Sequence, residues 1–502
     1  MENELLIVLL IPLLGGIFSL FFWKDIKSQK VIFLISATGL LLAASNLMVS
    51  VLDEGVITLQ SAGWEAPFGI SLVADYLSTF MVLLTSLMGL AVGVYTLGDM
   101  DRARMRFGFY PLMNFLLFSV CGAFMSGDIF NLYVWFEIML ISSFVLMALG
   151  NTKPQLEGAI KYVTMNIIAS VFFLAGIGVL YGLTGTLNMA DLALRIDSVP
   201  QEELITLAAI FFFIAFGVKS AVFPLFGWLP ASYHTPPVAV TAIFAGLLTK
   251  VGVYAFIRFF TLIFNQENLF LDNLLLFTAG TTMFVGVLGA AAQMEFRKIL
   301  SVHIISQIGY LIMGLAINTK LALAGVIYFM VHIVIVKSNL FLISGVVKRL
   351  RGSFELKKLG GVYGSHPFLA ILFAISAFSL AGFPPLSGFW AKFILVKAGL
   401  DVQDYLIVAV ALVVGFLTLY SMTKIWNEVF WKRMPDQDEY DKKHPPVKLW
   451  SMAPMMIPIV LLTALTLALG IFGEPIMHFA LMTAEQLQTP EIYINKVLQI
   501  SE

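Results

Sequence analysis

The sequence predicts an all-α polytopic membrane protein, and its composition and segmentation both lead to this fold class. Of the 502 residues, 59% are hydrophobic and 12% are charged, whereas soluble domains have about 25% charged residues. The mean hydropathy is +0.92. Long apolar blocks alternate with short polar loops, and each block has the roughly 20 residues that a helix needs to cross a bilayer. We therefore expect the chain to be embedded in lipid.

About fourteen such blocks follow one another along the chain. Acidic rather than basic residues precede the first block, and no small-residue cleavage site follows it, which favours a retained helix over a signal peptide. The approximate limits of the expected spans are 4–23, 31–51, 74–97, 107–126, 129–149, 158–183, 203–229, 237–262, 271–292, 299–317, 321–346, 367–398, 405–430 and 448–472.

The loops between the blocks alternate between two kinds. One kind is rich in Lys and Arg, such as the loop that holds Arg102, Arg104 and Arg106, whereas the other kind, such as 53–67 and 265–273, has almost none. By the positive-inside rule the basic loops are cytoplasmic. With an even number of spans, both termini are then expected outside.

Charge and cysteine content exclude several classes of function. The formal net charge of −1 argues against nucleic acid as a partner. The single cysteine, Cys121, excludes an internal disulfide and a cysteine-based metal site. Because the sequence has no metal-ligand cluster, nucleotide-binding loop or nucleophile motif either, we expect no metal and no cofactor.

Spans seven and twelve share a pattern that indicates an internal duplication. The segments VKSAVFPLFGWLP and SLAGFPPLSGFWAKF each have a Phe-Pro break, at Pro224 and at Pro384-Pro385, with a Gly-aromatic turn after it and a lysine nearby. Their offset of five spans places them in opposite directions, as in inverted repeats with discontinuous helices. The expected parts are N-terminal helices 1–3 (1–106), a first five-helix repeat (107–262), a second (271–430), and helix 14 with a tail (448–502).

Glu137 and Lys219 are the first two candidates for ion chemistry. Glu137 is the only acidic residue between Asp128 and Glu157, near the middle of span five. A carboxylate at that depth is either neutralised or paired, so it either transfers protons or locks helices together. Lys219 precedes the Pro224 break, where proline frees a backbone carbonyl. With Glu137 as partner it could hold and release a proton; alternatively it is a static cap on exposed carbonyls.

Three further lysines lie within apolar spans. Lys250 follows Pro237 by about 20 Å of helix, which places it close to mid-membrane. Lys337 is near the middle of span eleven. Lys392 is about 12 Å from the outer end of span twelve. It is either an exit group or a lysine that extends its side chain to the interface.

Two histidines complete the set of titratable groups in the spans. They are His332 and His303, and histidine is the residue type whose unperturbed pKa lies closest to physiological pH, although a lone histidine is also often a hydrogen-bonded core residue. Ser306 and Gln307 could hydrate the helix that carries His303. One carboxylate, four lysines and two histidines form the kind of chain that proton relays use.

These residues and motifs resemble the antiporter-like subunits shared by respiratory complex I and the Mrp cation/proton antiporters. The matching elements are Glu137, the VKSAVFPLFGWLPASYHTPPVAVTAIFAG block, Lys250, SVHIISQIGY, HIVIVKSNLFL and FPPLSGFWAKF. The resemblance covers nearly the whole chain. The resemblance implies fourteen helices with two inverted five-helix units and a polar axis at mid-membrane. It also implies that Glu137 pairs with Lys219, that Lys250 and Lys337 relay protons, and that Lys392 faces the outer exit.

The expected function is that of a proton-translocating subunit of a multi-subunit Na⁺/H⁺ antiporter in the bacterial cell membrane. Its partners would be other subunits of the complex, and its cargo would be protons and, at the level of the complex, Na⁺. It would be a transporter subunit and not an enzyme. Two alternatives stay open: a proton-pumping membrane subunit of a quinone-linked NADH dehydrogenase-like complex, and a scaffold subunit that translocates nothing.

Overall fold

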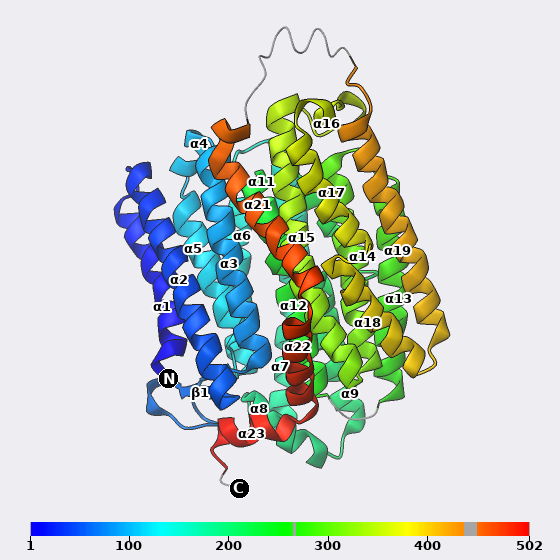
Figure 1. The fold of residues 1–502 in the computed structure, drawn as a ribbon. Coiled ribbons are helices and arrows are strands. Elements are labelled where there is room, and N and C mark those ends of the chain that lie inside the picture. The colour runs from blue at the N-terminus through cyan, green and yellow to red at the C-terminus, as the bar shows by residue number, and fades with distance from the viewer. Residues whose placement is uncertain (1, 265–267, 436–448, 501–502) are drawn as a thin grey trace.

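The computed structural model describes residues 2–264, 268–435 and 449–500, and almost all of its helices run between the two ends of one bundle (Figure 1). The expected all-α membrane fold is confirmed. Among the described residues, the one β-sheet has two antiparallel strands, β1 (Ile57–Gln60) and β2 (Ser71–Ala74). It lies at the end of the bundle where both termini lie.

The helices follow the expected segmentation closely. In the N-terminal part they are α1 (Glu2–Phe21), α2 (Ile26–Glu54), η1 (Ser61–Gly63), α3 (Tyr76–Asp99) and α4 (Arg102–Arg106). Next come α5 (Phe109–Phe124), α6 (Ile129–Ala148), α7 (Lys153–Thr184), α8 (Met189–Arg195), η2 (Ile196–Ser198), α9 (Glu202–Ser220), α10 (Trp228–Ser232), α11 (Val238–Ile243), the π-helical η3 (Phe244–Leu248) and α12 (Thr249–Leu262).

The second half of the chain repeats this style of organisation. Its helices are α13 (Leu269–Ala291), α14 (Phe296–Ile317), α15 (Lys320–Arg351), η4 (Leu356–Lys358), α16 (Val362–Ser365), α17 (Pro367–Ala381), α18 (Ser387–Asp401), α19 (Tyr405–Ile425) and the π-helical η5 (Trp426–Trp431). The C-terminal part has η6 (Leu449–Met452), α21 (Ala453–Ile471), α22 (Glu474–Gln488) and α23 (Pro490–Leu498).

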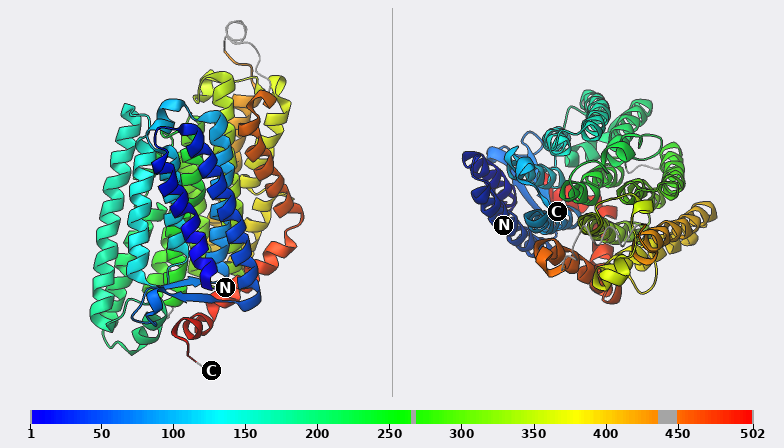
Figure 2. Two further views of the ribbon diagram at one scale, coloured as in Figure 1. Left: turned by 90° about the vertical axis from the view of Figure 1, so that its left-hand side faces the viewer. Right: turned by 90° about the horizontal axis from the view of Figure 1, so that it is seen from above.

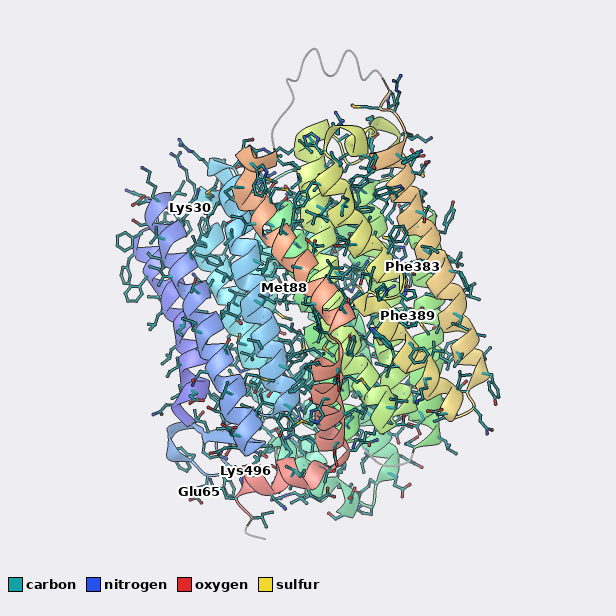
Figure 3. The ribbon with its side chains drawn as sticks, in the orientation of Figure 1. Lys30, Glu65, Met88, Phe383, Phe389 and Lys496 are labelled. Carbon is teal, nitrogen blue, oxygen red and sulfur yellow. The ribbon has the colours of Figure 1, made fainter. Side chains whose placement is uncertain are left out.

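Twelve helices within the described ranges are long and apolar enough to cross a membrane. The two remaining expected spans correspond to the shorter α5 and to the pair α17 and α18, so every expected span has a helical counterpart. Lys30 lies at one end of the bundle, and Glu65 and Lys496 lie at the other end beside both termini (Figure 3).

Both expected helix breaks are present. After α9 ends at Ser220, Ala221 adopts a left-handed φ of 62°, and the chain stays unwound past Pro224 until α10 begins. After α17 ends, Gly382 has a φ of 95°, and α18 begins only after Pro384-Pro385. Proline at each break cannot donate the amide hydrogen bond that would continue the helix.

The last crossing differs from expectation, because the segment expected as a tail is helical. α21 and α22 follow one another along the bundle, and α23 lies across its end (Figure 1). Gly473 and Pro475 separate α21 from α22, since proline in the first turn of α22 has no amide hydrogen to extend α21. The C-terminal region therefore contributes a third discontinuous crossing.

Several features recur five spans apart. α7 and α15 each have 32 residues, and π-helical segments accompany both span eight and span thirteen. The helices α6 and α14 are capped by Asp128 and Glu295, and each capping residue forms an isolated antiparallel bridge. From these correspondences we propose that 107–262 and 271–430 are inverted repeats.

The centre of the bundle is formed by the span of α11–η3–α12, by α14 and by α15, which are almost entirely buried. Seen from above, α1 and α2 form one margin of the molecule and α19 forms the opposite one (Figure 2). The titratable residues of the buried helices are thus enclosed by protein on all sides.

Candidate functional site

Glu137 lies near the middle of α6, where its side chain is only partly buried. Its carboxylate accepts a hydrogen bond from the hydroxyl of Ser170 on the neighbouring α7. Ser170 was not among the expected site residues, because a lone serine in an apolar helix has no distinguishing sequence pattern. Glu137 is therefore less enclosed by this chain than the buried lysines described below.

Lys219 lies in the last turn of α9 and is 4% exposed. Its ammonium sits over the ring of Phe136, 4.6 Å from the ring centre, and has no hydrogen-bond partner among the described residues. The Glu137 carboxylate is the charged group that exerts an electrostatic effect on this ammonium. Among the described residues, however, no ion pair within 4.0 Å joins the two side chains. Lys219 thus contacts the ring of Phe136, the residue before Glu137, and does not form the direct pair that the resemblance implies.

Lys250 occupies the first turn of α12, directly after η3, and is 1% exposed. Its ammonium donates a 2.6 Å hydrogen bond to the carbonyl oxygen of Ala245 inside η3. The end of α9 approaches closely here, since a Cβ on Gly252 would lie 2.5 Å from the Ser220 hydroxyl. Glycine at 252 is what lets the Lys219 end of α9 lie against the Lys250 turn of α12.

Lys337 lies at the centre of α15 with no exposed surface. Its ammonium donates to the carbonyl oxygen of Leu300 on α14 at 3.1 Å. Lys250 and Lys392 are the charged groups that exert an electrostatic effect on it, and we call these three buried lysines the lysine row. Lys337 and Ser170 each follow the first residue of their 32-residue helix by seventeen positions, which places the two at equivalent points of the proposed repeats.

Lys392 lies on α18 beyond the second break. Its ammonium donates to the carbonyl oxygens of Leu380 and Ala381, at 3.0 and 3.1 Å, which are the last carbonyls of α17. It also lies 5.1 Å from the ring centre of Tyr310. A mostly apolar cavity of about 380 Å³ between α14, α17, α18 and α19 has Lys392 in its wall.

His332 is joined to the same break. Its Nδ1 is 2.9 Å from the hydroxyl of Ser387, the first residue of α18, and that hydroxyl is 3.0 Å from the hydroxyl of Ser379. A Cβ at Gly388 would lie 1.8 Å from the carbonyl oxygen of Ser379 and 2.8 Å from Cε1 of His332. The contact between His332 and the break thus depends on glycine at 388.

His303 is fully buried on α14, and neither of its ring nitrogens has a hydrogen-bond partner among the described residues. Lys337, Lys392 and Lys424 are the charged groups that exert an electrostatic effect on its ring. Gln307 donates a 3.3 Å hydrogen bond to the Ser306 hydroxyl. The structure places this group beside the lysine row and shows no direct bond from it to a lysine.

Comparison with known proteins assigns the family. A family model described as NADH:quinone oxidoreductase/Mrp antiporter, transmembrane, matches residues 126–418. The Na⁺/H⁺ antiporter D subunit of Alkalihalophilus pseudofirmus is 46% identical over 499 residues, which are 99% of this chain and 100% of that protein. The chain belongs to the family of Mrp-type antiporter D subunits.

Solved structures agree with this family assignment. A chain of the Mrp complex from Dietzia sp. has 31% sequence identity and a TM-score of 0.88, and the match covers 99% of both chains. A chain of respiratory complex I from Thermus thermophilus matches with a TM-score of 0.78 at 22% identity, over 96% of this chain and 99% of that one. The second match shows a shared fold.

The chain also has a half-buried lysine in the last turn of an apolar helix that sequence reasoning missed. Lys424, near the end of α19, donates to the carbonyl oxygens of Ala291 and Gln293 at 2.6 and 2.7 Å, directly before η5. It lies outside the range of the family model. The criterion that identified Lys250, a basic residue inside an apolar block, would have found it. In the part of the chain that the structure describes, no three His, Cys, Asp or Glu side chains gather as a metal site.

Proposed function

We propose that this chain is the proton-translocating subunit of a multi-subunit Na⁺/H⁺ antiporter of the bacterial cell membrane, with both termini outside. It would act as a transporter subunit, assembled with other subunits that complete the antiport reaction. The row of buried lysines carries this proposal. Burying each cation costs several kcal/mol of folding free energy, and proton transfer is a function that explains why these lysines are present at that depth.

The protonation state of each lysine in the lysine row is coupled to the backbone around it, because each ammonium group binds a backbone carbonyl oxygen. Lys250 and Lys392 both donate to carbonyl oxygens at helix irregularities, and Lys337 donates to a carbonyl of the adjacent helix. Like charges in one row disfavour each other, so the arrival of a proton at one lysine favours its release from the next. This is the property that a stepwise relay needs.

The geometry supports a relay that runs across the subunit in the plane of the membrane. Glu137 is partly exposed at one end of the expected series of groups, and Lys392 borders a cavity between α18 and α19 at the other end. Lys219, Lys250 and Lys337 would connect them through the buried centre. Each proton that enters down the membrane potential releases about 2.3 kcal/mol of free energy per 100 mV. This free energy would drive Na⁺ outward through the complex.

The test is antiport by the whole complex in everted membrane vesicles, with Glu137→Gln and Lys219→Ala. Glutamine keeps an acceptor for Ser170 but holds no proton, so we expect Na⁺-driven ΔpH to fall by about tenfold or more while the complex still assembles. Glu157→Gln is the matched control, since Glu157 on the exposed end of α7 pairs only with Lys161 in the described structure.

Three outcomes would contradict the proposal. Full antiport in both variants, at normal complex levels, would show that the buried charges carry no protons. A loss of complex on native gels in proportion to the loss of antiport would instead indicate a scaffold subunit. Flavin or iron–sulfur absorbance in the purified native complex would favour a dehydrogenase assembly.

A further inference from the structure

A cavity of about 540 Å³ lies beside the third discontinuous crossing, where α21 ends and α22 begins. Its walls are formed by α15, α18, α21 and α22. Two of its residues, Trp390 and Ile471, are 40% and 58% exposed, so the cavity is open to the surroundings of the chain. Apolar and aromatic side chains dominate the lining, which includes Tyr328, Trp390, Glu474, Met477, His478 and Leu481.

The break between α21 and α22 lies against the second helix break. A Cβ on Gly470 would lie 2.5 Å from the carbonyl oxygen of Pro385. The last carbonyls of a helix have no partner within it. Here the Tyr328 hydroxyl donates to the Leu469 carbonyl at 2.6 Å, and the Trp390 indole donates to the Gly470 carbonyl at 2.9 Å. Side chains of α15 and α18 therefore hold the end of α21 in place.

Glu474, the first residue of α22, lies within the depth of the bundle. From Glu474 to Gln488, α22 is about 21 Å long, and Gln488 donates to the carbonyl oxygen of Asn318 at the end of α14. Glu474 and His478 are both exposed. Within the described ranges, the Glu474 carboxylate forms no ion pair or hydrogen bond. A carboxylate at membrane depth normally pairs with a cation, and this chain supplies none from its described residues.

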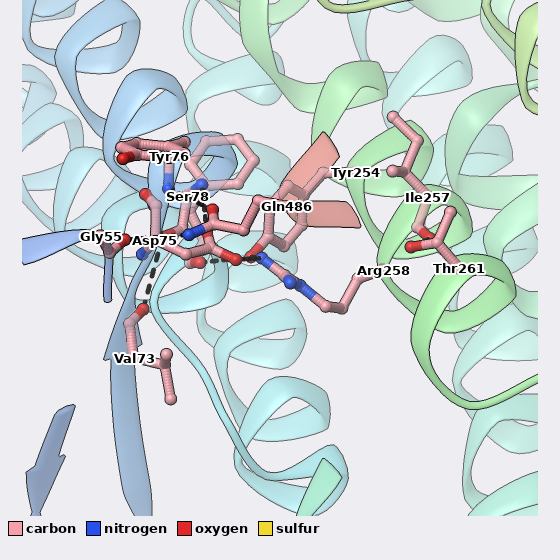
Figure 4. Close-up of polar contacts among 11 residues, drawn as sticks. Gly55, Val73, Asp75, Tyr76, Ser78, Tyr254, Ile257, Arg258, Thr261 and Gln486 are labelled. Atoms are coloured by element: carbon pink, nitrogen blue, oxygen red, sulfur yellow. Dashed lines mark hydrogen bonds and ion pairs between the residues drawn. The ribbon is translucent and has the colours of Figure 1, made fainter. Parts of the chain in front are cut away.

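The far end of α22 is fixed to the rest of the chain (Figure 4). Gln486 accepts a 3.0 Å hydrogen bond from the backbone amide of Tyr76 and donates one of 3.0 Å to the carbonyl oxygen of Gly55. Both ends of α22 are thus held by contacts within this chain. Glu474 cannot reach water by a shift of its helix, so its cation has to come from outside the chain.

We propose that this cavity receives a lysine or arginine side chain from a membrane helix of another subunit of the complex, and that this cation pairs with Glu474. The long apolar stem of such a side chain suits the apolar lining. A cation is also attracted to the face of an indole ring such as that of Trp390, and its hydrogen bond to a carboxylate is a strong one. The inference concerns assembly and goes beyond the proposed proton relay.

The lining favours this occupant over a bare sodium ion or a lipid amine. Glu474 is the one acidic residue in the described lining, and the carbonyl oxygens of Leu469 and Gly470 already accept hydrogen bonds. A bare ion would therefore find few oxygen ligands. A lipid carries its amine in the head-group layer, whereas Glu474 is separated from the end of the bundle by the length of α22.

A photoreactive residue, p-benzoylphenylalanine, in place of Phe472 tests for the partner in the assembled complex. Phe472 is 71% exposed and lies between the cavity residues Ile471 and Gly473, and the probe keeps its aromatic ring. After illumination of membranes, we expect a covalent product between this chain and another subunit, identified by mass spectrometry. A product with lipid alone, or no product, would overturn the proposal.

Glu474→Lys and Glu474→Gln test the charge. Lysine places a second cation beside the partner's cation, so we expect the level of assembled complex on native gels, and the yield of the cross-link, to fall by about tenfold. Glutamine removes the attraction without adding repulsion, so both quantities should fall by about threefold. Glu491→Lys is the matched control, because Glu491 is an exposed acid in the first turn of α23, outside the cavity, and it should change neither.

Two results would contradict the role of Glu474. Normal complex levels in Glu474→Lys would show that no cation pairs with this carboxylate in the complex. A parallel loss of the chain itself from membranes that lack the other subunits would place the defect in the fold of this chain. If Glu137→Gln abolishes antiport while Glu474→Lys assembles normally, the interface alone fails and the proposed function stands.

Discussion

Lys250, Lys337 and Lys392 differ in sequence context but share one kind of partner, a backbone carbonyl oxygen. Carbonyl partners explain how a cation is tolerated at this depth without a carboxylate beside it. The same logic explains Lys424, whose ammonium binds the two carbonyls at the end of α13. At the residue scale, the buried lysines of the site bind backbone carbonyl oxygens more often than carboxylates.

His234 gives a test of residue-scale electrostatics outside the spans. It lies between α10 and α11, and Pro230 supplies a carbonyl 2.9 Å from its Nδ1. Burial, together with Lys298 and Arg297, lowers the pKa of His234 from 6.5 to about 4. The unfolded chain therefore binds more protons between these two pH values, and the free energy of unfolding falls as pH falls through that window.

Replacing this histidine should make the free energy of unfolding depend less on pH between about pH 7 and pH 4.5. We expect the melting temperature of His234→Gln to fall by a few degrees less than that of the parent between about pH 7 and pH 4.5. His478→Gln, at an exposed position on α22, is the control and should follow the parent. Parallel curves for parent and His234→Gln, measured by thermal melting in detergent, would contradict the role given to burial.

The residue scale is also where sequence reasoning succeeds and fails most clearly. A lone charge in an apolar block is visible in the sequence, so Glu137, Lys219 and the other lysines could be named. Their partners could not, because carbonyl acceptors and serines such as Ser170 and Ser387 have no sequence pattern of their own. The expected direct pair of Glu137 and Lys219 depended on the rotation of two helices, which spacing along one chain does not determine.

At the element scale, helix breaks are predictable where proline causes them. Pro224 and Pro384-Pro385 marked two of the discontinuities correctly. The π-helical segments η3 and η5 were not expected, since a π segment needs no special residue. The break between α21 and α22 was missed because the sequence after it was assigned to a tail, although Gly473 and Pro475 mark it.

Gly388 tests whether the second break is held by close packing. A Cβ there would lie 1.8 Å from a backbone oxygen of α17, which a flexible side-chain motion cannot relieve. We expect Gly388→Ala to separate α18 from α17 and to cost about 1–3 kcal/mol. It should also lower antiport, because the His332 contact with Ser387 is lost. The measurement is thermal melting of the purified complex beside the vesicle assay.

Gly178→Ala is the matched control for this prediction. Gly178 also lies within a membrane helix, α7, but a Cβ there meets nothing within 4 Å. Alanine should be neutral or slightly stabilising, since it is the better helix former. A Gly388→Ala complex as stable and as active as Gly178→Ala would show that α17 and α18 adjust freely.

On the scale of the whole molecule, composition and the segmentation into apolar blocks were sufficient for the fold class. Lipid leaves few folds other than helical bundles open to such a chain. The helices that face partner subunits could not be predicted in this way, because a face that contacts lipid and a face that contacts another membrane subunit are both apolar. Here the partly exposed Glu137 is the informative residue, since a carboxylate at that depth needs a cover other than lipid.

Val171→Cys tests for that cover. Val171 follows Ser170 in α7 and is 63% exposed on the outer side of that helix. Cys121 is the sole native cysteine and is fully buried, so the new thiol alone should react. We expect a lipid-soluble maleimide to label it about tenfold more slowly in the assembled complex than in the isolated subunit. Equal rates, measured by mass shift, would show that this face meets lipid in both.

The lysine-to-carbonyl bonds have one more consequence, which concerns infrared light. A charged donor shortens and strengthens a hydrogen bond to a carbonyl relative to a neutral one, and a stronger hydrogen bond lowers the stretching frequency of that C=O bond. When Lys250 releases its proton, the Ala245 carbonyl should therefore absorb at higher frequency, and an isotope label at that single carbon would isolate the band. The backbone would then act as a built-in spectral reporter, so that proton occupancy could be followed during turnover without an added dye.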